Sequence, residues 1–177
     1  MAVNKKLAIF CGSSTPKDPE FFNEIKQFLG KLFNERPFDI VYGGANIGVM
    51  GQVADIALSY SRLVYGVMPT FLKDREVDHQ GITQFEICET MHDRKEKMYL
   101  LSDAFLILPG GLGTFDEFYE ILTWRQLKLH QKPIYLFNLR GYFDSTLEQL
   151  RQMEAMGFIK SEDLKLIKVV QTVADID

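Results

Sequence analysis

Short apolar runs alternate along the chain with longer segments in which apolar residues recur every three or four positions. The short runs predict strands over residues 7–12, 38–44, 63–69, 104–110 and 133–139. The longer segments predict helices over about 18–35, 48–61, 91–102, 114–129 and 143–156. An alternating segment at 84–89 fits a strand or an ordered loop, and the stretch from Ser161 predicts a helix followed by a short edge strand.

This alternation of strands and helices predicts an α/β fold with a mainly parallel sheet and helices on both faces. The runs at 104–110 and 133–139 are apolar at nearly every position, as strands covered on both sides must be. The length of 177 residues suits one domain spanning residues 1–177. In such sheets ligands bind at the carboxyl ends of the strands, so the residues that follow each strand are the candidates for function.

Composition narrows the possible partners. The chain carries 20 basic and 24 acidic side chains, a net charge of −4, without the basic cluster that a nucleic acid would require. No apolar stretch approaches the roughly 20 residues needed to span a bilayer, and the N-terminus lacks a signal-peptide core. Cys11 and Cys88 have no metal-ligand spacing and read as buried small residues. We therefore expect a cytoplasmic protein with no membrane and no nucleic-acid partner.

Three of the strands are followed by glycine-rich turns. These turns are CGSS at 11–14, GGANIGVMG at 43–51 and PGGLGT at 109–114. A glycine turn that enters a helix presents free N–H groups and the positive end of the helix dipole, which suits a phosphate group. None of the turns has the spacing of a dinucleotide-binding or P-loop motif, so the phosphate should anchor the ligand rather than react.

The predicted helix at 114–129 carries two acids. Thr114 and Glu117 fit a capping box, which is the structural interpretation of both residues. Glu117 and Glu120 share one face with Trp124, which favours a covered cleft over a solvated flank. The opposite face, which should pack on the sheet, consists of Phe115, Phe118, Ile121, Leu122 and Leu129.

A positive partner for these acids lies on the helix at 91–102. Arg94 falls on the apolar stripe of this helix with Met91, Met98 and Leu101, and Lys95 lies at the margin of the stripe. An arginine on a buried face needs a partner, and its planar fork suits a carboxylate or a phosphate. The alternative is a structural ion pair with a glutamate. The histidines lack any metal-ligand grouping, so no metal is expected.

These motifs resemble those of the LONELY GUY (LOG) family of cytokinin riboside 5′-monophosphate phosphoribohydrolases, whose bacterial relatives often carry the label lysine decarboxylase-like. MHDRK at 91–95 followed by PGGLGTFDE at 109–117 carries the resemblance, which extends to the other two glycine turns, to Arg75-Glu76 and to LTWRQL at 122–127. The resemblance implies a Rossmann-like fold, a homodimer and no cofactor. It also implies that Arg94 and Glu117 are the catalytic pair.

The candidate substrate-binding residues combine the glycine turns with the residues that the resemblance implies. They are Ser13, Ser14, Gly43, Gly44, Glu76, Met91, Arg94, Lys95, Gly110, Gly111, Leu112, Gly113, Thr114, Phe115, Asp116, Glu117, Glu120 and Thr123. Trp124 and Leu127 form an apolar patch beside the expected cleft, which favours a two-fold dimer.

The expected reaction is hydrolysis of the N-glycosidic bond in an adenine-type nucleoside 5′-monophosphate, to the free base and ribose 5-phosphate. Glu117, kept ionised by the helix N-terminus, would stabilise the positive charge that develops on the ribose. Two alternatives are a general AMP nucleosidase of purine salvage and a non-catalytic nucleotide-binding module. A decarboxylase using pyridoxal phosphate is disfavoured, because its Schiff-base lysine would have to be Lys95, beside an arginine in an anion site.

Overall fold

A computed structural model describes residues 4–73 and 78–177. The strands are β1 (Lys6–Phe10), β2 (Asp39–Tyr42), β3 (Val64–Pro69), β4 (Gln84–Cys88), β5 (Ala104–Ile107), β6 (Ile134–Phe137) and β7 (Ile167–Val170). The α-helices are α1 (Pro19–Glu35), α2 (Gly48–Ser59), α3 (Thr70–Lys73), α4 (Met91–Leu101), α5 (Leu112–Gln126), α6 (Asp144–Ala155) and α7 (Ser161–Leu164). Two 3₁₀ turns, η1 (Leu139–Gly141) and η2 (Val173–Asp175), complete the elements of the described ranges. Every strand and long helix that the sequence predicts is present.

The seven strands form one sheet in the order β4-β3-β2-β1-β5-β6-β7, and each neighbouring pair is parallel. The segment left open between strand and loop is β4, which pairs with β3 at one edge of the sheet. The C-terminal stretch forms α7 and then β7 at the other edge. This arrangement confirms the predicted α/β fold class.

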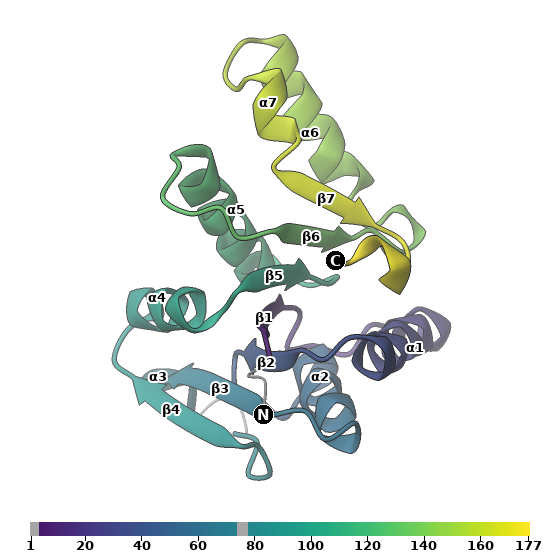
Figure 1. Cartoon of the computed structure of the whole chain (residues 1–177), viewed down its shortest axis with the longest axis vertical. Helices are drawn as coiled ribbons and strands as arrows, with labels where there is room; N and C mark the ends of the chain where they lie inside the picture. Colours follow the sequence, from purple (N-terminus) through teal and green to yellow (C-terminus); the bar gives the residue numbers. More distant parts are fainter. Residues whose placement is uncertain (1–3, 74–77) are drawn as a thin grey trace.

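Helices cover both faces of the sheet (Figure 1). On one face α1 and α2 bury side chains such as Leu29, Phe33 and Val53 against the strands. On the other face α4, α5 and α6 contribute Met98, Phe118 and Leu150 to a second core. The inner strands are therefore shielded from water on both sides, which explains their continuous apolar runs. The edge strands β4 and β7 are only partly covered, and Ile87 and Val169 are exposed there.

The direction of winding reverses between β1 and β5, which are neighbours at the middle of the sheet. The chain leaves β1 toward one edge through β2, β3 and β4, and then returns to β5 beside β1. The loops that follow β1 and β5 consequently diverge to opposite faces of the sheet. Such a switch point creates a crevice at the carboxyl ends of the two strands.

Helix α5 differs from its predicted extent at both ends. It begins at Leu112 rather than Thr114, with Gly111 as its N-cap. It ends at Gln126, and Lys128 adopts a left-handed φ of 62° that stops the helix before Leu129. Leu129 is 64% exposed, so the prediction that it packs on the sheet was wrong. Trp124 is half-buried and packs edge-on against Tyr99 at 5.0 Å between ring centroids.

The cysteines, the apolar segments and the cap of α4 have structural explanations. Cys11 and Cys88 are buried and unbridged, as expected of small apolar residues. The described helices include none long and apolar enough to span a bilayer. A true capping box occurs at the start of α4, where Thr90 and Asp93 exchange side-chain to backbone hydrogen bonds. This box fixes the first turn of the helix that carries Arg94.

Candidate active site

The three glycine turns meet at the carboxyl end of the sheet. A β-carbon on Gly12 would lie 3.3 Å from the Cα of Gly110, so the first and third turns touch backbone to backbone. Gly48 has a φ of 56°, and a β-carbon there would overlap the carbonyl group of Ser13. The amide of Met50 also donates to the carbonyl of Gly12 at 3.2 Å. The glycines thus allow three loops to pack around one point.

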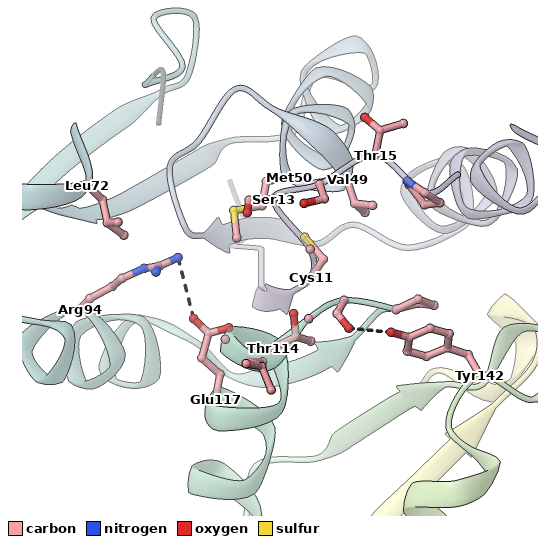
Figure 2. A pocket seen from close by; sticks show the side chains of 18 of the residues that line it. Cys11, Ser13, Thr15, Val49, Met50, Leu72, Arg94, Thr114, Glu117 and Tyr142 are labelled. Atoms are coloured by element: carbon pink, nitrogen blue, oxygen red, sulfur yellow. Dashed lines mark hydrogen bonds and ion pairs between the residues drawn. The ribbon is translucent and has the colours of Figure 1, made fainter. Parts of the chain in front are cut away.

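A cavity of about 650 Å³ opens where these loops meet (Figure 2). This volume is sufficient for a nucleotide-sized ligand. Ten of the predicted substrate-binding residues line the cavity: Ser13, Ser14, Met91, Arg94, Gly110, Gly111, Leu112, Gly113, Thr114 and Glu117. The predicted catalytic pair is therefore brought together with the first and third glycine turns.

Arg94 of α4 and Glu117 of α5 both line this cavity, and their side chains point toward each other (Figure 2). Their side chains are each 5% exposed, and Nη2 of Arg94 lies 3.8 Å from Oε1 of Glu117. A β-carbon on Gly43 would overlap the guanidinium group, so this glycine provides the space that Arg94 occupies. At 3.8 Å the two charges attract each other but do not form a short hydrogen bond, which leaves both groups free to contact a ligand.

Burial raises the pKa of Glu117 to about 7, although the nearby Arg94 acts in the opposite direction. Glu117 lies six residues after the N-cap Gly111, in the second turn of α5, whereas the helix dipole acts mainly within the first turn. The sequence predicts that the helix N-terminus helps to keep this carboxyl ionised, but Glu117 lies beyond the turn where that effect is strong. Near neutral pH Glu117 exists in both the charged and the neutral form, as suits a general acid or base.

The N-terminus of α5 forms another wall of the cavity. Its N-cap, Gly111, has no side chain to satisfy the first amides, so the N–H groups of Leu112, Gly113 and Thr114 have no acceptor inside the helix. A β-carbon on Gly111 or Gly113 would meet no atom within 4 Å, so both glycines border open space. Together with the positive end of the helix dipole, these amides suit an anion.

Thr114 does not cap α5, and the predicted capping box with Glu117 is wrong. Because the helix begins two residues earlier than expected, Thr114 lies inside its first turn. Its buried hydroxyl group has no hydrogen-bond partner among the described atoms, and neither does Nε of Arg94. Buried polar groups are rarely left unpaired in a folded protein. Both of these groups belong to residues that line the same cavity.

Several predicted residues lie outside the cavity. Lys95 forms ion pairs with Asp116 and Glu120 at 3.1 Å each, and these hydrogen bonds raise the pKa of Lys95 although burial alone would lower it. The hydroxyl of Thr123 donates to the carbonyl of Tyr119 one turn earlier in α5. The other candidates that do not line the cavity are Gly43, Gly44 and Phe115, whereas Glu76 and its neighbour Arg75 lie outside the described residues.

The cavity also contains residues that sequence reasoning missed. They are Cys11, Gly12, Thr15, Pro16, Phe21, Val49, Met50, Phe71, Leu72, Pro109 and Tyr142. Cys11, Gly12, Val49, Met50 and Pro109 belong to the glycine turns that the sequence singles out, although they were not named as ligand contacts, and Thr15 and Pro16 directly follow the first turn. Tyr142 follows β6, more than 20 residues from the nearest glycine turn, and only the order of the strands places it here. No group of His, Cys, Asp and Glu within the described ranges could hold a metal ion.

The fold and the site define a Rossmann-like α/β protein whose ligand cavity lies at the switch point of a parallel sheet. Residues 50–176 match the family described as "Possible lysine decarboxylase", and the chain belongs to this family. It is 39% identical to cytokinin riboside 5′-monophosphate phosphoribohydrolase LOG7 of Arabidopsis thaliana, over 92% of this chain and 75% of that protein. It is 36% identical to the enzyme LOG of Oryza sativa subsp. japonica, over 92% of this chain and 67% of that protein. The resemblance to the LOG family is confirmed.

Solved structures support the fold independently of these sequences. The molybdenum cofactor binding protein of Rippkaea orientalis aligns with a TM-score of 0.68 over 98% of this chain and 94% of that chain, at 20% identity. The molybdenum cofactor carrier protein of Chlamydomonas reinhardtii aligns with a TM-score of 0.69 over 98% and 93% of the two chains, at 16% identity. At these identities the similarity concerns the fold alone.

Proposed function

We propose that this chain is a nucleoside 5′-monophosphate phosphoribohydrolase. It hydrolyses the N-glycosidic bond of an adenine-type nucleotide and releases the free base and ribose 5-phosphate. The observation that carries the proposal is the buried Arg94–Glu117 pair, which faces a cavity closed by the uncapped N-terminus of α5. The printed activity of the LOG relatives, about 36–39% identical to this chain, supports the same reaction.

The phosphate group occupies the N-terminus of α5 in this proposal. The free amides of residues 112–114 and the hydroxyl of Thr114 supply donors, and Gly111 and Gly113 let the backbone approach the anion. Binding energy from this remote group then fixes the ribose beside Glu117. The apolar side chains of Phe71, Leu72 and Met91 supply a surface for the base.

Glu117 acts at the other end of the sugar. As the bond from C1′ to the base nitrogen breaks, its electron pair leaves with the base and positive charge develops on the ribose ring. The ionised carboxylate of Glu117 stabilises this charge and takes a proton from the water whose oxygen bonds to C1′. The departing base takes up a proton from solvent, and Glu117 later returns its proton to solvent, so that one water molecule is consumed overall. Arg94 lines the same cavity and has an unpartnered Nε, and its charge orients the carboxylate.

The decarboxylase description of the family does not suit this cavity. A pyridoxal phosphate enzyme forms a Schiff base with a lysine that reaches its active site. The described lining residues include no lysine, and Lys95 is held by Asp116 and Glu120 outside the cavity. The residues that face the ligand are instead an acid and an arginine, which suit glycosidic hydrolysis.

We extend the proposal to the assembly and the substrate. Leu127 is exposed beside Trp124 on the outer side of α5, an apolar surface that suits the partner subunit of a homodimer. The buried, unbridged cysteines suit a reducing compartment such as the cytoplasm. The substrate is a cytokinin riboside 5′-monophosphate, as the names of the relatives indicate.

A chromatographic assay of base release tests the function. The panel contains AMP, the N6-isopentenyl derivative of AMP, and the corresponding nucleosides without phosphate. The wild-type chain should release base from the monophosphates, and fastest from the N6-substituted one. Preference for AMP would identify a general salvage nucleosidase. Tight binding of both nucleotides without release of base over hours would identify a non-catalytic binding module instead.

The variant Glu117→Gln tests the assigned acid. Base release should fall at least about a hundredfold, whereas AMP should still bind, because the amide keeps the shape of the side chain but cannot accept a proton. Glu96→Gln is the matched control, since Glu96 is exposed on α4 and outside the cavity. Unchanged turnover in Glu117→Gln would remove Glu117 from the mechanism.

A further inference from the structure

Tyr142 contacts the glycine turn that precedes α5. It lies in the turn after β6 and lines the cavity, and its hydroxyl donates to the carbonyl of Gly110 at 2.6 Å (Figure 2). Gly110 directly precedes Gly111, the N-cap of α5. The tyrosine therefore touches the peptide that leads into the proposed phosphate site, although the two segments are 32 residues apart.

The turn that carries Tyr142 is held by an unusual number of contacts. Arg140 and Gly141 have φ values of 50° and 73°, and for a residue other than glycine such a conformation costs energy. Arg140 forms ion pairs with Asp18, the N-cap of α1, at 2.9 Å, and with Glu20 of α1 at 3.2 Å, and it also pairs with Glu24. Asn138 closes the turn by accepting from the amide of Phe143 at 2.7 Å. A strained turn that is fixed from several sides indicates that the position of its side chains matters.

The ring of Tyr142 is also fixed. It packs against Phe21 of α1 at 6.1 Å and edge-on against Phe143 at 4.9 Å. Phe143 is fully buried and packs edge-on against Phe115 of α5 at 5.7 Å. These contacts link the β6–α6 turn to the first turns of both α1 and α5 and restrain Tyr142 beside Gly110, although the residue is 45% exposed.

The hydrogen bond to Gly110 limits the contacts that the hydroxyl of Tyr142 can make with a ligand. This hydroxyl has one proton, which it donates to Gly110, so it cannot also donate to a bound anion. A free carbonyl oxygen beside a phosphate would repel the phosphate. The hydrogen bond from Tyr142 engages the carbonyl oxygen of Gly110 and so reduces this repulsion. Because the peptide is planar and trans, fixing the carbonyl of Gly110 also fixes the direction of the N–H of Gly111 on the opposite side.

We propose that Tyr142 is a positioning residue for the phosphate-binding turn. By holding the Gly110–Gly111 peptide it sets the amides at the N-terminus of α5 for the 5′-phosphate, and it makes no direct contact with the phosphate. This role rests on the proposed hydrolase function, because it concerns how that substrate is anchored. It assigns a function to a residue that the sequence motifs did not indicate.

The variant Tyr142→Phe tests this role, because it removes one hydroxyl group and keeps the ring. We expect KM for the nucleoside monophosphate to rise about tenfold, the effect of losing one well-placed hydrogen bond, with kcat changed less than about twofold. Calorimetry should show the same loss of affinity for ribose 5-phosphate and unchanged affinity for adenine. A general loss of structure would instead lower the affinity for both ribose 5-phosphate and adenine.

Tyr99→Phe is the matched control. The hydroxyl of Tyr99 also donates to a backbone carbonyl, that of Leu129, but outside the cavity. This variant should leave KM and the affinity for ribose 5-phosphate unchanged. An unchanged KM in Tyr142→Phe, or an equal loss of affinity for adenine and ribose 5-phosphate, would overturn the assignment. If the wild-type chain releases no base, the hydrolase proposal fails, and the ribose 5-phosphate comparison still decides the role of Tyr142.

Discussion

The two ends of the sheet differ in how they satisfy their buried polar groups. At the amino ends of the strands, the ring of buried His130 bonds to the carbonyl of Ile121 and to the amide of Lys132. The hydroxyl of Ser102 donates to the carbonyl of Met98, and the carboxyl of Asp39 accepts from the amide of Leu63. Each of these groups has its partner within the protein, which is the usual outcome of folding.

The carboxyl ends hold both kinds of group. Buried Asn138 is paired with Phe143 and Asp144, but other buried polar groups there have no partner. The buried polar side-chain atoms without a partner in the described chain are the hydroxyl of Tyr42, Nε of Arg94 and the hydroxyl of Thr114. Tyr42 ends β2, and the other two line the cavity. Leaving such groups unpaired costs about 1–3 kcal/mol each, so folding alone does not favour the arrangement. The comparison shows that the unpartnered groups of the described chain gather at the end of the sheet that holds the cavity, where the proposed function gives Arg94 and Thr114 a ligand.

Among the substitutions at the carboxyl end of the sheet, removing Arg94 should have the largest effect on base release. In Arg94→Ala we expect base release to fall at least about a hundredfold, because the variant loses a charge beside the reacting bond and leaves Glu117 buried without its partner. The chromatographic assay of base release measures this fall in activity. Arg151→Ala, which removes an exposed guanidinium on α6, should change nothing. Normal activity in Arg94→Ala would mean that the Arg94–Glu117 pair is purely structural.

The pH dependence of turnover tests the state of Glu117. Burial raises its pKa to about 7, and the proposed mechanism uses the ionised form, so kcat should rise as the pH increases through 7. At pH 5 it should be about a hundredfold below its plateau, because the ionised fraction falls tenfold for each unit below the pKa. Measuring kcat at saturating substrate limits the influence of the phosphate group, whose own pKa lies near 6.

A profile that falls with increasing pH would contradict this assignment. It would mean that the protonated form of Glu117 is the active one and that the residue donates a proton to the leaving base. Binding of ribose 5-phosphate over the same pH range provides the control, since it reports the phosphate site without the chemical step.

The fold and the position of the functional end of the sheet could be predicted from the sequence. Continuous apolar runs separated by periodic segments determine a parallel sheet, and the glycine turns after its strands indicate the functional end. Arg94 was found because a charge interrupts an apolar stripe, and the structure buries it as expected. Local patterns of this kind are visible in sequence because they repeat with the period of a helix or a strand.

The details of the site depend on tertiary contacts that no local pattern records. Gly111 caps α5 without a side chain, so the sequence favoured Thr114 as the start of the helix. The pKa of Glu117 depends on burial by neighbouring elements. Lys95 looked like a ligand for an anion, but acids from the adjacent helix neutralise it. Tyr142 reaches the site only because β6 lies beside β5.

The smallest expected effects come from removing one hydroxyl group at each end of the sheet. These two variants compare the carboxyl end with the amino end directly. Thr114→Val removes an unpartnered hydroxyl at the cavity, and Ser102→Ala removes a partnered one at the amino end. Thr114→Val should raise KM roughly fivefold to tenfold without lowering Tm, because no protein hydrogen bond is lost. Ser102→Ala should lower stability by about 1 kcal/mol and leave KM unchanged.

Steady-state kinetics and thermal unfolding of the two variants measure both quantities side by side. A lower Tm for Thr114→Val would show that this hydroxyl has a partner inside the folded chain, and the distinction between the two ends would then fail at that residue. An unchanged KM together with an unchanged Tm would remove Thr114 from the phosphate site but leave the amides of α5 in place. The expected pattern, in which each variant alters only one of the two quantities, would separate groups kept for the ligand from groups kept for the fold.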